Sequence, residues 1–352
     1  MSKFRLSGRK RQAAGIILIA IMLWIIVYAP TPLVIYEPGL TFETAPLVQH
    51  GSEQTKVSRL AEKGEEGAFL VTTVKLTDAK YWQVIQTAWQ KDFDVYSKDS
   101  VLQGKSEQNY LKRMKLEMVA SQNTAIEAAY RYAGIAYSKE DELYISDING
   151  ASKDVQIGDR VIKADGHSVN DIRQLTSALS GKKDGDSVRL TINRSGKTLD
   201  AAVPYKLIEG NITTALTSPV KDEISLGELQ VVLAKDLRDR IEINAGEVGG
   251  PSAGLMFTLQ SLNFVLDEDL TRGLRIAGTG TINEYGNVGA IGGINYKVAA
   301  ADLAGAQLFL APEDNYEEAA AKVKSLGSSM RVISVHSLQD AIYAISAIVN
   351  NK

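Results

Sequence analysis

Two short stretches are the most informative in this 352-residue chain: GPSAG at residues 250–254 and IGGINYK at residues 291–297. In the first, glycines permit a tight turn and proline is favoured at the first helical position, so Ser252 lies at a loop-to-helix junction. In the second, Lys297 falls just inside another helix whose neighbouring positions are mostly alanine and valine. Small neighbours allow close packing, and desolvation lowers the pKa of a lysine toward the range in which it acts as a base.

The two residues together predict a Ser–Lys dyad. A serine hydroxyl needs a base at neutral pH, and a neutral lysine amine supplies one. Backbone N–H groups near Gly250 and Ser252, at the positive end of a helix dipole, suit an oxyanion hole. Taken singly, Ser252 is also typical of an ordinary helix start, and Lys297 of a solvated surface. The pair favours acyl transfer to serine, which is the chemistry of a peptidase.

Composition excludes several other kinds of site. The net charge is −3, which gives no nucleic-acid footprint for the whole chain. Cysteine is absent, so disulfides, thiol nucleophiles and cysteine-based zinc sites are excluded. The histidines at positions 50, 167 and 336 show no metal-ligand spacing. We therefore expect neither a metal nor a cofactor.

The N-terminus differs from that of a soluble protein. Basic residues up to position 11 precede an apolar stretch at residues 13–29, which residues 33–36 can extend. A stretch of this length is near the lower limit for crossing a bilayer. A signal peptide would have a shorter apolar region and a cleavage site with small residues. We expect an uncleaved single-pass anchor at residues 1–36, with the basic flank in the cytoplasm and the later domains extracellular.

Residues 37–133 are predicted to form a membrane-proximal region. A β-branched, aromatic stretch at residues 67–76 predicts a strand. Apolar residues at spacings of three and four predict helices at residues 79–90 and 106–132. The methionine and aromatic stripe of the second helix is typical of a core.

Residues 134–206 change to the pattern of short strands around one helix, and they resemble a PDZ domain. The resemblance rests on IGDRVI at residues 157–162, ADGHSV at residues 164–169, the following helix and GDSV at residues 185–188. It implies that an extended peptide binds beside one strand, with a nearby loop holding its carboxylate. The residues implied for this peptide site are Gly134, Ile135, Leu143, Ile145, Leu175 and Leu179. A small β domain that serves only as a spacer is the alternative.

Residues 207–352 alternate strands and helices, which predicts a compact α/β domain. This block resembles the proteolytic domain of Lon proteases, because the family's dyad serine lies in GPSAG and its lysine follows an IGG segment by four positions. Ser252 and Lys297 are 45 positions apart, which is about the family spacing. The resemblance also implies that Thr279, in the Thr-Gly pair between them, hydrogen-bonds the lysine and orients it.

The predicted fold class is α+β multidomain: a transmembrane helix, a PDZ-like β domain and an α/β Lon-type proteolytic domain. No Walker motif is present, so substrates must already be unfolded, flexible or short, and we expect no ATP. In this order the parts resemble the membrane-anchored PDZ–Lon peptidases of Gram-positive bacteria, the SepM/YlbL type. That resemblance implies an exported peptide substrate, such as a competence or quorum-sensing pheromone. A catalytically inactive PDZ scaffold and a signal-peptidase-like processing enzyme remain the alternatives.

Overall fold

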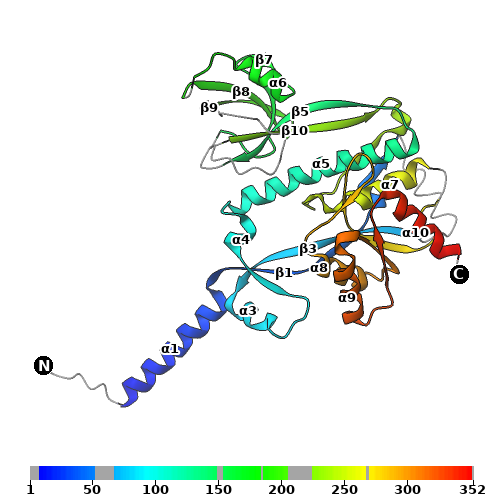
Figure 1. Cartoon of the computed structure of the whole chain (residues 1–352). Coiled ribbons are helices and arrows are strands. Elements are labelled where there is room, and N and C mark those ends of the chain that lie inside the picture. The colour runs from blue at the N-terminus through cyan, green and yellow to red at the C-terminus, as the bar shows by residue number, and fades with distance from the viewer. Residues whose placement is uncertain are drawn as a thin grey trace.

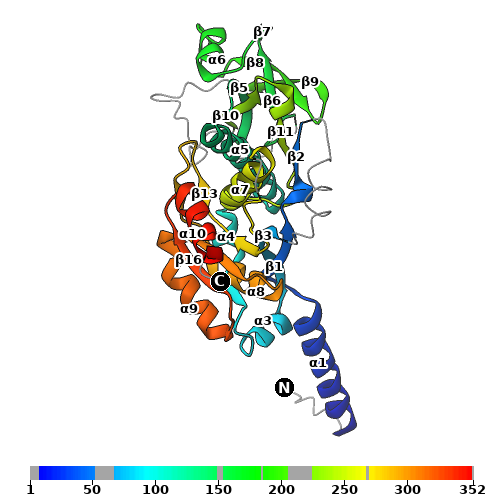
Figure 2. The ribbon, with the colours of Figure 1, turned by 90° about the vertical axis from the view of Figure 1, so that its right-hand side faces the viewer.

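The computed structural model of the chain describes residues 8–51, 67–148, 154–183, 185–204, 224–266 and 269–350. The described residues form a larger and a smaller lobe, and the N-terminal helix α1 (Gly8–Tyr28) projects from the larger one (Figure 1). The smaller lobe lies at the end of the molecule opposite α1 (Figure 2). The long helix α5 (Glu107–Ala133) packs against both lobes.

The larger lobe is built on a six-stranded sheet with the strand order β16-β15-β12-β3-β1-β4. Strands β3, β12, β15 and β16 are parallel, whereas β1 pairs antiparallel with β3 on one side and β4 on the other. The strand bounds are β1 (Pro30–Glu43), β3 (Ala68–Lys80), β4 (Asp94–Ser97), β12 (Arg275–Gly278), β15 (Leu308–Pro312) and β16 (Arg331–Val335). The two ends of the chain therefore build one sheet.

Different helices cover the two faces of this sheet. In β3, Phe69 and Val71 belong to the core shared with α5, α7 and α10, while Leu70 belongs to the core shared with α8 and α9. Successive side chains of a strand point to opposite faces, so β3 contributes to both cores. The helix bounds are α7 (Gly254–Val265), α8 (Ile294–Leu303), α9 (Tyr316–Leu326) and α10 (Leu338–Asn350).

The smaller lobe is a sheet with the order β10-β5-β6-β8-β9, in which β7 also pairs with β6. Helix α6 (Ile172–Ala178) begins at Asp171, whose carboxylate accepts a hydrogen bond from the Gln174 N–H and caps the helix. The strand bounds are β5 (Tyr137–Ile148), β6 (Arg160–Ala164), β7 (His167–Ser168), β8 (Ser187–Arg194), β9 (Lys197–Pro204) and β10 (Ile224–Ala234). This lobe has its own buried apolar core.

Short elements connect these parts. Strand β2 pairs with β11, and β13 pairs with β14 in a small hairpin next to α7. Their bounds, with those of the short helices, are η1 (Ala45–Leu47), β2 (Val48–His50), α3 (Tyr81–Thr87), α4 (Lys98–Leu102), η2 (Leu237–Asp239), β11 (Ile241–Ile243), η3 (Pro251–Ala253), β13 (Thr281–Ile282), β14 (Val288–Gly289) and η4 (Glu313–Asn315).

The structure corrects the predicted domain boundaries. The sequence predicts a separate region at residues 37–133, but β1, β3 and β4 are strands of the main sheet and α5 packs on α7. The PDZ-like lobe is therefore an insertion between two parts of one α/β lobe. Strand propensity predicts the strand at residues 67–76 correctly but not its partner, because pairing depends on contacts about 200 residues away in sequence.

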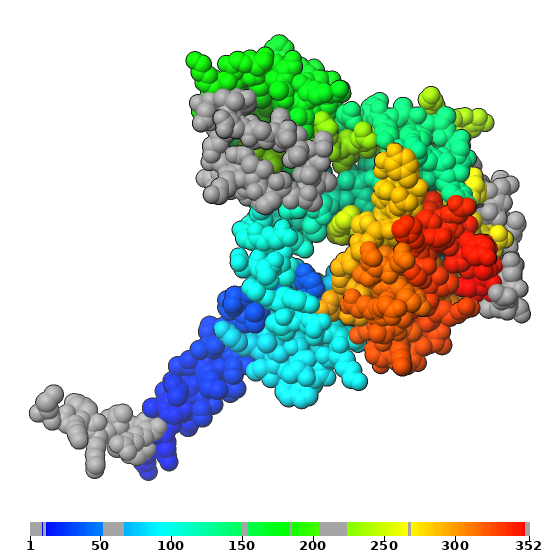
Figure 3. Space-filling model, in the orientation of Figure 1, coloured from blue at the N-terminus to red at the C-terminus, as the bar shows by residue number. Residues whose placement is uncertain are grey.

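The N-terminal prediction is also changed. Residues 33–36, expected to extend the membrane span, lie in β1, where Val34 and Ile35 are buried in the sheet. Among the described residues, no helix has the combined length and apolar character that crossing a membrane requires. Helix α1 stands clear of the body (Figure 3). It exposes its large apolar side chains, including Ile16, Leu18 and Trp24.

Candidate active site

Ser252 lies in η3, the short 3-10 turn that leads into α7. Gly250, just before the turn, has φ = +83°, a backbone conformation that favours glycine. Pro251 occupies the first helical position, where its missing N–H costs no hydrogen bond. Helix α7 is buried throughout most of its length, so the main core of the larger lobe fixes the position of the turn.

Lys297 reaches this turn from α8. Its Nζ lies 2.9 Å from the Ser252 Oγ and 3.0 Å from the carbonyl oxygen of Thr72 on β3, and it donates to both. The Lys297 residue is only 5% exposed. The structure thus brings together the two residues on which the sequence argument for a dyad depends.

Burial gives Lys297 an unusual basicity. Desolvation lowers the pKa of Lys297 from 10.5 to about 8, and no neighbouring charge among the described residues opposes this change. Both contacts of the amine are to neutral oxygens, which orient it without the Coulombic attraction of a carboxylate. The neutral fraction of Lys297 near pH 7 is therefore much larger than that of an ordinary lysine, and a neutral amine 2.9 Å from a hydroxyl can accept its proton.

Thr279 does not make the predicted hydrogen bond to Lys297. Its Oγ1 donates instead to the backbone carbonyl of Ser252 at 2.9 Å, and the Gly280 N–H donates to the same carbonyl at 2.9 Å. The hydroxyl of Thr279 therefore contacts the backbone of Ser252 instead of the amine of Lys297. Thr279 thus positions Ser252. The contact to Lys297 that was predicted for Thr279 is made instead by the backbone carbonyl of Thr72.

The two predicted oxyanion donors differ in their hydrogen bonding. The Gly250 N–H donates to the carbonyl of Met114 on α5 at 2.8 Å, so it is already engaged. Ser252 occupies the second position of the 3-10 turn, where a backbone N–H has no partner within the helix. Of the two predicted groups, the Ser252 N–H remains the candidate for binding an oxyanion.

Helix α5 is part of this site, and the sequence does not predict this. Besides the contact from Met114, the Oγ of Ser121 donates to the carbonyl of Pro251 at 3.0 Å. Met114 and Ser121 are seven residues apart, so they lie on one face of the helix. The helical stripe predicts that this face is buried, but it carries no signal for the partner. The Thr72 carbonyl is a backbone group and has no sequence signal.

The predicted peptide groove of the PDZ-like lobe is not an open strand edge. Strand β10 pairs antiparallel with β5 along its whole length, which covers the edge at residues 143–148. Leu143 and Ile145 are fully buried, and Leu175 belongs to the same core, with Leu179 packed at its margin. Glu228 of β10 also accepts a hydrogen bond from the Ile172 N–H at the start of α6, at 2.6 Å.

The predicted carboxylate loop belongs to the end of α5. Gly134 is the helix C-cap, with φ = +71°, and Ile135 packs against the core of the larger lobe. The Ile135 N–H donates to the Tyr130 carbonyl at 2.9 Å, which closes the helix end. Neither residue lies beside an open groove on β5, because the chain's own β10 occupies that edge.

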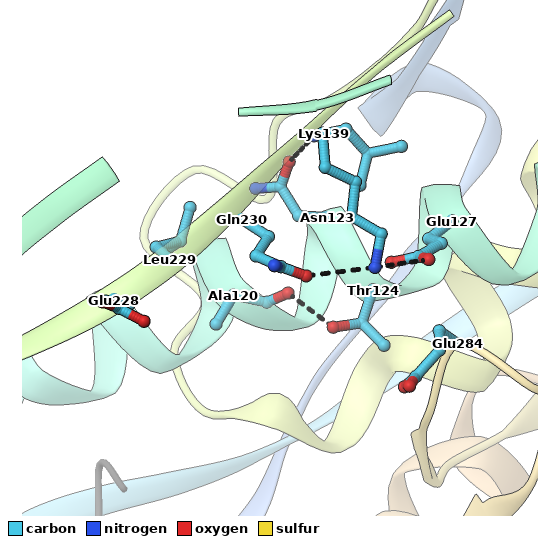
Figure 4. A pocket seen from close by; sticks show the side chains of 10 residues that line it. Ala120, Asn123, Thr124, Glu127, Lys139, Glu228, Leu229, Gln230 and Glu284 are labelled. Atoms are coloured by element: carbon cyan, nitrogen blue, oxygen red, sulfur yellow. Dashed lines mark hydrogen bonds and ion pairs between the residues drawn. The ribbon is translucent and has the colours of Figure 1, made fainter. Parts of the chain in front are cut away.

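A polar cavity of about 200 Å³ lies where β10, α5 and the loop after β13 meet (Figure 4). Lys139 of β5 enters it and contacts Glu127 at 2.8 Å and Gln230 at 3.1 Å. Glu284, from the loop between β13 and β14, lines the opposite wall. Thr124 donates to a carbonyl of its own helix. Among the described residues that line this cavity, no hydroxyl is paired with a base.

Two segments of the chain match known protein families. Residues 134–204 match the PDZ domain, and residues 217–347 match the Lon protease (S16) C-terminal proteolytic domain. The first match covers most of the smaller lobe. The second match covers β10 of the smaller lobe and the part of the larger lobe that carries Ser252, Thr279 and Lys297.

Curated relatives of both kinds are also found. The chain is 26% identical over 268 residues to a Lon protease of Rickettsia felis, covering 66% of this chain and 33% of that protein. It is 31% identical over 128 residues to a mitochondrial Lon protease homolog of Neurospora crassa, covering 33% of this chain and 11% of that protein. It is 40% identical over 63 residues to a serine protease Do-like HtrA of Lactobacillus helveticus, covering 18% and 14%.

The chain thus spans a third or less of the length of each relative, and the similarity lies in domains. The Lon-type match explains the α/β lobe around Ser252, and the PDZ match explains the inserted sheet. The chain therefore carries a segment that matches a PDZ domain and a segment that matches the C-terminal proteolytic domain of Lon proteases.

Proposed function

We propose that this chain is a serine endopeptidase in which Ser252 is the nucleophile and Lys297 the general base. The observation that carries the proposal is the 2.9 Å contact between the Ser252 Oγ and an amine whose pKa burial lowers to about 8. The Lon-type proteolytic domain supports it, because the same segment of the chain supplies both residues. Thr279 is a positioning residue in this proposal, since it holds the Ser252 backbone.

The reaction follows from these positions. Neutral Lys297 takes the Ser252 proton while the Oγ attacks the scissile carbonyl, which becomes a tetrahedral oxyanion. The Ser252 N–H donates to the oxyanion. The Lys297 ammonium, held by the Thr72 carbonyl, then gives its proton to the leaving amine, and the peptide bond breaks. A water molecule, deprotonated by the same amine, releases the acyl group and restores the serine hydroxyl.

We further propose that the substrates are exported peptides or unfolded proteins cleaved without ATP, including a competence or quorum-sensing pheromone. The chain's resemblance to the anchored PDZ–Lon peptidases is the basis of this part.

In the same proposal α1 attaches the protein to the cell membrane, and the lobes face outward. The basic N-terminal flank and the exposed apolar side chains of α1 support attachment. Carbonate extraction of membranes from cells that make the full chain, compared with a chain starting at residue 30, tests it.

The central proposal is tested with purified protein, an unfolded substrate such as reduced casein, and a fluorophosphonate probe that labels activated serines. We expect the wild type to cleave and to be labelled, and Ser252→Ala and Lys297→Ala to do neither. Cleavage by either variant at the wild-type rate would contradict the dyad. A wild type that neither cleaves nor reacts would instead favour a catalytically inactive PDZ scaffold. Labelling of the Ser252→Ala variant would favour a different serine, as in a signal-peptidase-like enzyme.

A further inference from the structure

The backbone on both sides of Ser252 is held from outside its own turn. The Ser252 carbonyl accepts from Thr279 and Gly280, which follow β12. The preceding peptide group is held from the other direction, because the Pro251 carbonyl accepts from the Ser121 Oγ at 3.0 Å. Ser121 is 7% exposed and lies on α5, outside the residues that match the Lon-type domain.

The Pro251 carbonyl and the Ser252 N–H belong to the same peptide group. A peptide group is planar, and in the trans form its C=O and N–H point in opposite directions. No cis peptide bond occurs among the described residues, so this one is trans. A hydrogen bond that fixes the carbonyl oxygen toward α5 therefore fixes the Ser252 N–H away from α5. It also polarises the peptide group, which strengthens the N–H as a donor.

We propose that Ser121 is a positioning residue that aims the Ser252 N–H at the oxyanion. The proposal rests on the proposed peptidase function, since it names the support of the same site. Ser121 touches neither the substrate nor Lys297 in this role, and it acts through the rigid peptide group that joins residues 251 and 252. Its effect belongs to the transition state, where the oxyanion carries its charge.

Close packing keeps α5 at this distance. A side chain at Gly249 would bring a Cβ within 2.9 Å of the Met114 Cβ, so glycine there lets the turn lie directly on the helix. The Gly250 N–H then reaches the Met114 carbonyl at 2.8 Å, one contact further along the turn. The turn before the serine is thus held at two points of one helix face, and Ser121 makes the contact nearest Ser252.

The test compares Ser121→Ala with Thr124→Ala in the full chain. Thr124 lies one turn further on the same helix, and its hydroxyl donates only to the helix carbonyl of Ala120. We measure kcat and KM for peptide cleavage, and the affinity of a peptide aldehyde, which forms a tetrahedral adduct with serine. For Ser121→Ala we expect kcat and aldehyde affinity to fall together, about 10- to 100-fold, with KM nearly unchanged. Thr124→Ala leaves all three unchanged.

Further measurements separate positioning from folding and from the dyad. The Ser121→Ala variant should keep the wild-type acid limb of its pH–rate profile, because Lys297 is not altered. Ser121→Thr, which keeps the hydroxyl, should recover most of the lost kcat, and thermal unfolding shows whether each variant is folded. Wild-type kcat and aldehyde affinity in Ser121→Ala would overturn the proposal, as would a loss confined to KM or to thermal stability. If the wild type and Ser252→Ala are equally inactive, the peptidase function itself fails, and this inference fails with it.

Discussion

A buried lysine and an exposed lysine, in two regions of the molecule, have pKa values shifted in opposite directions. Lys297 faces a hydroxyl and a carbonyl in the candidate active site, and burial lowers its pKa to about 8. Lys139 faces Glu127 in the cavity beside β10, and its hydrogen bond to that carboxylate raises its pKa. Both amines have close oxygen partners, so contact alone does not decide their basicity. Lys297 can act as a general base because it is buried and has no carboxylate beside it to stabilise the charged ammonium.

Helix α5 separates the two regions. Ser121 on one face contacts the turn of the nucleophile, while Glu127 lies on the wall of the cavity (Figure 4). The cavity side carries its compensating carboxylate on the helix itself. The catalytic side receives from the helix only a hydroxyl and a carbonyl, which hold the backbone without charging it. One helix thus supports two sites of opposite electrostatic character.

The largest expected effect removes each amine in turn. Lys297→Met should lower kcat/KM for cleavage of an unfolded substrate by about 10⁴-fold or more, since the hydroxyl loses its base. Lys139→Met should change kcat/KM by less than about threefold, because its amine is paired with Glu127 and meets no nucleophile. Steady-state kinetics of the two folded variants measure the contrast. Comparable losses in both variants would mean that burial without counter-charge is not what distinguishes the active site.

The two residues of the dyad could be predicted from the sequence, but the geometry around them and the contrast with Lys139 could not. The GPSAG and IGG segments predict a serine at a helix start and a lysine in an alanine-rich helix, and the structure has both at η3 and α8. The partner that the resemblance implies for Thr279 is wrong, because the order of residues along the chain cannot tell the lysine's amine from the serine's own carbonyl.

The role of the first third of the chain could not be predicted at all. The sequence predicts the strand at residues 67–76 and the helix at residues 106–132 nearly as they are. Their places in the active-site lobe depend on long-range pairing with β12 and packing on α7. The covering of β5 by β10 is likewise a tertiary choice between equally strand-forming segments. Local pattern fixes the elements, and contacts between segments that lie 27 to 225 residues apart in sequence fix the site.

The second effect is on stability, and its sign is opposite to that on activity. The pKa of Lys297 falls from 10.5 to about 8 on folding, so at pH 7 the folded state holds a disfavoured charge or has lost a proton. This difference corresponds to about 3 kcal/mol of destabilisation. Lys297→Met removes it but also removes two hydrogen bonds, so we expect a net gain of roughly 1–2 kcal/mol at pH 7.

The pH dependence of that gain is the sharper measurement. Between pH 8 and 10.5 the unfolded wild type binds more protons than the folded one, so its stability from this group rises with pH. The advantage of Lys297→Met should therefore shrink over this window, vanish at about pH 9.5 and become a disadvantage above it, where only the lost hydrogen bonds count. Urea unfolding of both proteins at pH 7 and pH 9.5 gives the two differences. An advantage that is independent of pH would show that Lys297 is not neutralised on folding.

The third effect is on the pH–rate profile of the wild type. If neutral Lys297 is the base, kcat/KM should rise about tenfold for each pH unit on the acid side and level off above pH 8 or so. Lys139, whose pKa is raised, contributes no limb in this range. The control is Lys139→Met, which should keep the same limb. A profile that is flat from pH 6 to pH 9 would contradict the role of Lys297.

The smallest expected effect comes from removing the negative charge of Glu127 beside Lys139. Glu127 is 4% exposed and accepts hydrogen bonds from the Tyr137 hydroxyl and the Lys139 amine. Glu127→Gln keeps the shape and one acceptor but removes the charge, so it should lower the pKa of Lys139 and cost about 1–2 kcal/mol of folding free energy. NMR titration of the lysine side chains and urea unfolding measure the two quantities. Activity should stay within about twofold of wild type, because Lys139 would stay protonated near neutral pH and faces no hydroxyl paired for transfer. An unchanged pKa of Lys139 would mean that the carboxylate is not what distinguishes the two lysines.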